Sequence, residues 1–120
     1  MKTSELIGPA LDWAVAKCEN ALKNIDHFTG YGGVFSASFE HAPESGLYSP
    51  SSDCAQGGPI IEREYISTID CDGYDFWRAE KMNAKAQVVT TYGPTPLVAG
   101  LRTYVASKLG YEIEIPEELK

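Results

Sequence analysis

Metal-binding and redox-active residues are scarce in this sequence. Its 120 residues include three cysteines, without a Cys-x-x-Cys pair, and two histidines, His27 and His41, that stand far apart. A zinc site needs about four preorganised ligands, so we expect neither a metal nor a cofactor. The odd number of cysteines, and an N-terminus without the basic and apolar pattern of a secretory signal, predict free thiols and a cytoplasmic protein.

Positive charge and long apolar runs are also in short supply. The chain has 10 Lys and Arg against 17 Asp and Glu, a net charge of -7, and no basic cluster. Nucleic-acid binding depends on cations that displace phosphate counterions, so we expect no nucleic-acid partner. The apolar runs fall far below the ~20 residues that cross a bilayer, so we expect no membrane segment. Length and a hydrophobic content of 43% predict one globular domain, residues 1–120.

Two segments have the apolar spacing of helices. The first covers about residues 9–22, where Pro9 suits the first turn. The second covers about residues 95–109, with Thr95 as its N-cap and Gly110 as the residue that ends it. Short stretches with an apolar period of two, separated by polar turns, predict strands at "VFSASF", "PIIEREYI", "YDFWRAEKM", "AQVVTTY" and "YEIEIP".

These elements predict an α+β fold. Four to five short strands would form a mainly antiparallel sheet that packs its apolar face on the two helices. Trp13 lies outside the main apolar stripe of the first helix and widens its apolar surface. Either a neighbouring loop or strand covers this second face, or Trp13 contacts a ligand or another subunit. The second alternative predicts a homo-oligomer with Trp13 in its interface.

The stretch "LYSPSSDCAQGG" is the candidate ligand loop. Serine and aspartate side chains can fix turns there, and the two glycines let the backbone approach a bound molecule closely. The loop could therefore orient a small polar, nucleotide-like ligand, with a turn-rich connection as the alternative. The predicted ligand-binding residues are Tyr48, Ser49, Ser51, Asp53, Gln56, Gly57 and Gly58 in the loop, with Glu62, Arg78 and Thr95 outside it.

No catalytic residue is assigned from the sequence. The serines lack a Gly-x-Ser-x-Gly turn, and the glycine pair is not part of a phosphate-binding loop. Cys54 could act as a nucleophile only with a base such as His41 to form its thiolate. Glu62 and Glu64 would share one face of a strand, a geometry that acid/base pairs use but that wet strands also show. The sequence favours a binding protein over an enzyme.

Four blocks together resemble a family of small phage proteins of unknown function. They are "SELIGPALDWAVAKCE", "YSPSSDCAQGGPIIERE", "WRA" and "GPTPLVAGLRTYVASKLGYEIEIPEEL", and the family includes the NinX-like proteins of lambdoid phages. Similar proteins commonly carry Trp at the position of Cys54, which argues against a catalytic thiol. The resemblance implies a phage or prophage protein in the cytoplasm of a bacterial host, accessory to phage growth, and it implies no activity.

Two functions follow as expectations. The first is a non-enzymatic protein that binds or sequesters a small, nucleotide-like molecule through the loop, for example a signal used in host defence. The alternative is an interaction module that docks on a host or phage protein, for example to modulate host defence. Both are arguments from context, because small phage accessory proteins often act in these ways.

Overall fold

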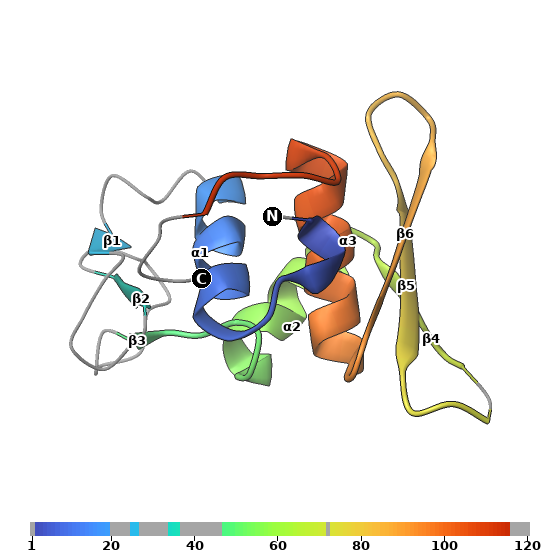
Figure 1. Cartoon of the computed structure of the whole chain (residues 1–120), viewed down its shortest axis with the longest axis horizontal. Helices are drawn as coiled ribbons and strands as arrows, with labels where there is room; N and C mark the ends of the chain where they lie inside the picture. Colours follow the sequence, from blue (N-terminus) through green and yellow to red (C-terminus); the bar gives the residue numbers. More distant parts are fainter. Residues whose placement is uncertain (1, 20–24, 27–33, 37–46, 72, 116–120) are drawn as a thin grey trace.

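Helix α3 lies between a three-stranded sheet and the helices α1 and α2 (Figure 1). The computed structural model describes residues 2–19, 25–26, 34–36, 47–71 and 73–115. The helical elements in chain order are η1 (Thr3–Glu5), α1 (Gly8–Cys18), α2 (Cys54–Arg63) and α3 (Pro96–Leu109). The sheet beside α3 has the antiparallel order β4 (Ser67–Asp70), β5 (Trp77–Met82) and β6 (Val88–Gly93). A second antiparallel sheet contains the short strands β1 (Ile25–Asp26), β2 (Val34–Ser36) and β3 (Leu47–Tyr48).

Local signals in the sequence set the ends of α3. The Thr95 hydroxyl accepts a hydrogen bond from the Val98 amide at 3.0 Å, and Pro96 occupies the first turn. Gly110, with φ +89°, ends the helix in a conformation that disfavours a side chain. The prediction of a helix at residues 95–109 is therefore confirmed. Most of α3 is buried because the sheet covers one side of it and α1 and α2 cover the other.

The β5–β6 hairpin confirms two predicted strands and the turn between them. Pairing runs from Trp77 opposite Gly93 to Met82 opposite Val88. At the turn, the Asn83 side-chain oxygen accepts hydrogen bonds from the amides of Lys85 and Gln87. Strand alternation then places successive side chains on opposite faces of the sheet.

The inner face of the sheet packs on α3 and carries a buried pair of threonines. Ala79 is fully buried, and its carbonyl oxygen accepts a hydrogen bond from the Thr103 hydroxyl. Thr91 on β6 donates to the Ala99 carbonyl, and its hydroxyl lies 2.7 Å from that of Thr103. The hydroxyls of this interface thus have partners, which removes the cost of burying them unpaired.

The prediction of a strand at "PIIEREYI" is wrong, because residues 54–63 form helix α2. A short apolar run such as Ile60-Ile61 does not distinguish a strand from a buried helix segment. Asp53 caps the helix by accepting a hydrogen bond from the Ala55 amide, although Pro59 lies inside the helix and lowers its propensity. Packing of Gly57 and Ile60 into the interior outweighs that local preference.

The fold class is confirmed as α+β with an antiparallel sheet, but a sheet of four to five strands is not. The part of the chain that the structure describes contains three α-helices, where two were predicted for the chain. The "YEIEIP" segment forms an isolated bridge, Lys2 to Glu112, and no named strand. The first helix is observed as Gly8–Cys18, and residues 20–22 of the predicted span lie outside the described part; so does the remainder of "VFSASF" after Val34–Ser36. None of the described helices is long and apolar enough to span a membrane.

Two adjacent glycines of α2 offer a matched test of this packing. A Cβ at position 57 would lie 2.3 Å from the Pro50 carbonyl oxygen and 2.7 Å from Leu97 Cδ1, whereas a Cβ at position 58 would meet nothing within 4 Å. We expect Gly57→Ala to lower the free energy of unfolding by about 1–3 kcal/mol through overpacking. Gly58→Ala should change it by less than about 1 kcal/mol, because better helix propensity is opposed by the contact of the new Cβ with the following Pro59. Urea unfolding of both variants checks this, and equal effects would contradict the arrangement of α2.

Candidate functional site

The polar groups of the predicted ligand loop bond to one another. The Ser49 amide donates to the side-chain oxygen of Gln56 at 2.9 Å, and the Gln56 side-chain amide donates to Asp53 Oδ2 at 3.0 Å. The Ser49 carbonyl accepts from the amides of Ser52 and Asp53. With Asp53 also capping α2, these residues form a compact helix-entry turn.

Ser51 lies inside the protein, against a buried acid that the sequence did not single out. Its amide donates to Asp12 Oδ1 at 2.8 Å. Asp12, in α1, is only 5% exposed. Burial raises the pKa of Asp12 to about 6, and the hydrogen bonds from Ser51 oppose this increase. One acid within the apolar run "ALDWAVA" was the sequence signal that could have identified it.

The other predicted ligand residues are dispersed over the fold. Gly58 and Glu62 lie along α2, with Glu62 exposed, and Thr95 caps α3. Arg78 is on β5, on the sheet face that α3 does not cover, so the structure does not bring it to the loop. Tyr48 belongs to β3, and its side chain is outside the described part of the structure.

Trp13 is in the hydrophobic core. Its side chain is 9% exposed, and it belongs to the buried cluster that α1 and α3 share. The Lys17 ammonium lies 5.4 Å from the ring centroid. Of the two alternatives for the wide apolar surface of α1, the structure shows coverage by the rest of the chain at this residue.

The structure shows no catalytic pair among the candidate residues that it describes. Cys54 is the exposed first residue of α2, and His41 lies outside the described residues. Glu62 and Glu64 are not neighbours on a strand; Glu64 follows α2 and accepts a hydrogen bond from Arg63 Nε at 2.9 Å. Across the described ranges, no group of three or more His, Cys, Asp and Glu could hold a metal ion.

A polar network joins the ends of α1 and α2 to α3. The Arg63 guanidinium donates two hydrogen bonds to the Glu19 carboxylate, at 3.0 and 2.7 Å, and the Tyr104 hydroxyl donates to the same carboxylate. Burial, with Glu19 nearby, raises the pKa of Cys18 to about 12, so this thiol stays protonated and unreactive. The network joins the three helices, and the protonated thiol of Cys18 beside it is not a reactive nucleophile.

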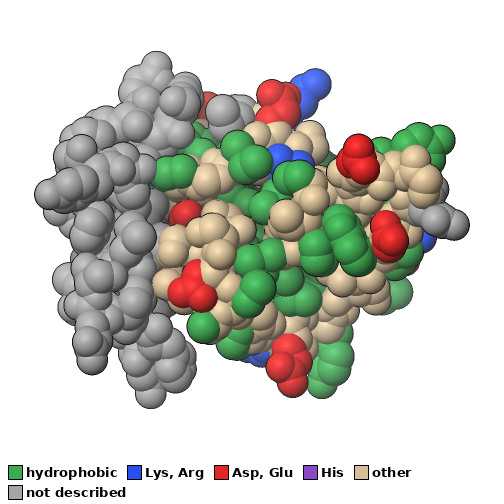
Figure 2. Space-filling view, turned by 90° about the horizontal axis from the view of Figure 1, so that it is seen from below, with side chains coloured by type: hydrophobic (Ala, Val, Ile, Leu, Met, Phe, Trp, Pro, Cys, Tyr) green, Lys and Arg blue, Asp and Glu red, His purple; other side chains and the backbone are tan. Residues whose placement is uncertain are grey.

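The face of the sheet that α3 does not cover carries exposed apolar side chains. Met82 and Val88 face each other across the β5–β6 pair and are 58% and 60% exposed. Arg78 faces Tyr92 in the same way, and Tyr92 is 49% exposed. Figure 2, which views the molecule from below the view of Figure 1 and not onto this face, shows hydrophobic side chains gathered over the middle of the described surface, with acidic side chains standing singly around them. We call the face of the sheet that α3 does not cover the outer face: Ser67, Ile69, Arg78, Glu80, Met82, Val88, Thr90 and Tyr92.

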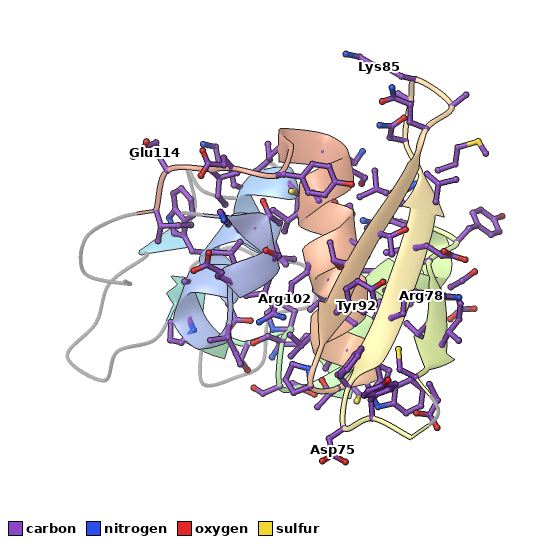
Figure 3. All side chains as sticks on the ribbon, turned by 45° about the vertical axis from the view of Figure 1, so that its right-hand side comes forward. Asp75, Arg78, Lys85, Tyr92, Arg102 and Glu114 are labelled. Carbon is purple, nitrogen blue, oxygen red and sulfur yellow. The ribbon has the colours of Figure 1, made fainter. Side chains whose placement is uncertain are left out.

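A groove of about 540 Å³ runs beside β6. The Arg102 guanidinium, from α3, reaches across to β6 and donates to the Tyr92 carbonyl at 2.7 Å (Figure 3). Segments distant in the sequence meet here, so no local pattern could have predicted the groove. It is lined by Ser4, Asp75, Phe76, Thr90, Thr91, Tyr92, Gly93, Pro94, Arg102 and Tyr111.

The family-model comparison matches residues 2–108 to the model described as Bacteriophage P22, NinX. The chain belongs to this family. The match spans the buried Asp12, the helix-entry turn, the outer face and all of the groove except Tyr111. No curated protein matches the chain.

Membership of the NinX family identifies a phage accessory protein and confirms the resemblance seen in the four sequence blocks. The family description carries no activity. The function of this NinX-family chain therefore has to be argued from its surfaces, since the polar loop groups are largely used within the fold.

The buried carboxyl of Asp12 predicts a specific pH dependence. Its folded-state pKa of about 6 lies above the ordinary 3.8, so between these values the native state holds a proton that the unfolded chain has lost. This contribution to stability is present below the unfolded pKa and is lost as pH rises through 6. Asp12→Asn keeps an oxygen for the Ser51 amide but cannot titrate. Relative to this variant, the free energy of unfolding of the wild type should fall by on the order of 3 kcal/mol between pH 4 and pH 7. Urea unfolding at each pH measures this difference. If the free energies of unfolding of the wild type and Asp12→Asn change with pH by the same amount, the burial of Asp12 is contradicted.

Proposed function

We propose that this NinX-family chain is a non-enzymatic accessory protein that binds another protein, of the phage or of its bacterial host, through the outer face. One observation carries the proposal: Met82 and Val88 form an exposed apolar pair on one face of a sheet whose other face is buried on α3, and the exposed Tyr92 lies on the same face beyond the Glu80–Thr90 pair. Exposed apolar residues are ordinary when scattered, but a contiguous group of them marks an interaction site.

The composition of the outer face supports protein binding. The exposed pair Met82 and Val88 offers apolar area near the β5–β6 turn. Arg78 and Tyr92, opposite each other across the strands, are of the residue types that contribute most to binding energy in interfaces. Among the described residues, the Arg78 guanidinium has one ion pair, at 4.0 Å with Glu80, and its Nε has no hydrogen-bond partner. A carboxylate or carbonyl of a partner could bond to the exposed part of that guanidinium.

Binding of a nucleotide-like ligand through the loop has less support. The loop side chains and amides that would contact a ligand already bond to Asp12, Gln56 and each other. Breaking such bonds to bind a ligand costs the free energy that they contribute to the fold. The proposal therefore assigns Arg78 to the protein interface and the residues of the loop to the structure. A location in the host cytoplasm belongs to the same proposal, and so does self-association, which would use the outer face in place of the buried Trp13.

Affinity capture followed by a matched pair of variants tests the proposal. The tagged chain is purified from phage-infected bacteria, and a captured protein is then produced pure and titrated with the wild type and with Val88→Glu. We expect the variant to bind at least tenfold more weakly, because it places a charge within an apolar contact.

The control is Tyr65→Glu, which adds the same charge at a residue that is 90% exposed and lies outside the outer face. It should change the affinity by less than about twofold. Equal binding by the wild type and Val88→Glu, with both folded by circular dichroism, would contradict the outer face as the interface. A chain that only dimerises, with dimerisation lost in Val88→Glu, would replace the proposed partner by a second copy.

A further inference from the structure

The groove beside β6 contains a positive charge without a carboxylate partner. Arg102 donates to two carbonyl oxygens, from Nε to Leu6 and from Nη1 to Tyr92, each at 2.7 Å. Within the described residues, no ion pair includes Arg102. Burial lowers its pKa, but a guanidinium stays charged at physiological pH. A half-buried cation that touches only neutral acceptors is stabilised by any anion that reaches its remaining N–H groups.

Aromatic side chains stand on the walls of the same groove. Tyr92 and Tyr111 are about half exposed, and the Phe76 ring meets Tyr92 edge to face with centroids 5.6 Å apart. Rings held in this way present faces on which a planar ligand can stack. Stacking on an aromatic side chain beside an arginine is a recurrent way of holding a base and its phosphate.

The edge of β6 adds hydrogen-bonding groups to the groove. Since the Tyr92 carbonyl points to Arg102, away from β5, strand alternation directs the backbone of Thr90 to the same side. Thr90 therefore offers an amide and a carbonyl at the groove, and the Ser4 side chain lies on its other wall. Asp75 lies on the β4–β5 loop and points outward in Figure 3, so the one acid of the lining is at the rim. It would repel an anion there and favour hydroxyl or amino groups.

We propose that this groove binds a small molecule that combines an aromatic ring with an anionic group, of the size of a nucleoside monophosphate. Arg102 binds the anion, Tyr92 and Tyr111 hold the ring, and the β6 edge orients its polar atoms. The volume of about 540 Å³ is within the range of small-ligand sites. This site is separate from the predicted loop and needs neither Met82 nor Val88.

Ligand titration followed by NMR amide shifts tests the site. The probes are the four ribonucleoside monophosphates, with adenosine and inorganic phosphate as the two halves of one of them. Adenosine monophosphate should shift the amides of Thr90, Tyr92 and Gly93 and bind more tightly than either half. Arg102→Gln should weaken its binding by about tenfold and change adenosine binding by less than twofold, because only the phosphate faces the guanidinium.

A second variant covers the case in which Arg102→Gln does not fold, since this residue also anchors two backbone carbonyls. Tyr111→Ala removes an exposed ring and should weaken the binding of adenosine and of its monophosphate alike. Tyr65→Ala removes an exposed tyrosine elsewhere and should weaken the binding of neither probe. The proposal is overturned if none of the four monophosphates shifts the groove amides at millimolar concentration, or if the shifts fall in residues 49–58. Equal weakening of adenosine and its monophosphate by Arg102→Gln would also overturn the role of the guanidinium. Thr90 and Tyr92 belong to both surfaces, but Val88 does not line the groove, so Val88→Glu should bind the probes normally and separates this proposal from protein binding.

Discussion

Burial of α3 on both sides is the constraint on which the rest of this fold depends. A helix that is apolar around most of its circumference must be covered on all sides, and here the sheet covers one side while α1 and α2 cover the other. Thr103 on α3 fixes the distance to the sheet by bonding to the Ala79 carbonyl, and Tyr104 fixes the other side by bonding to Glu19. The positions of β5, α1 and α2 all follow from contacts with this helix.

Polar groups in the interior are placed where the chain must be held in one arrangement. The Asp12 carboxyl is buried at an energetic cost that appears as its raised pKa. In return, its bond to the Ser51 amide joins α1 to the turn that begins α2, across 39 residues of sequence. The glycine, serine and glutamine residues of that turn are then explained by geometry: Gly57 lets α2 approach the Pro50 carbonyl, and Gln56 bonds to the Ser49 amide. The predicted ligand loop is thus also a connection that positions a helix.

A sheet with three strands leaves surfaces that a larger sheet would cover. Among the described α-helices, α3 packs on its inner face while its other face remains exposed, and β6 is the edge strand beside Arg102. Edge strands and open faces are liabilities unless a protein uses or protects them. Both proposals start from these uncovered surfaces. In the first a protein binds the outer face, and in the second a small aromatic anion binds at the edge of β6. Membership of the NinX family places these surfaces in a phage accessory protein.

The sequence by itself determined α3 and the β5–β6 hairpin. The cap at Thr95, the left-handed Gly110 and the turn chemistry of Asn83 act within a few residues, so they can be read without the rest of the fold. Only the tertiary structure decided that residues 54–63 form a helix, because packing of Gly57 and Ile60 outweighed the local cost of Pro59. It also decided that Trp13 and Ser51 are buried, and that the groove brings Ser4, Arg102 and Tyr111 together from distant parts of the chain. Contacts between residues so far apart leave no period or motif in a sequence, since they exist only once the chain has folded around α3.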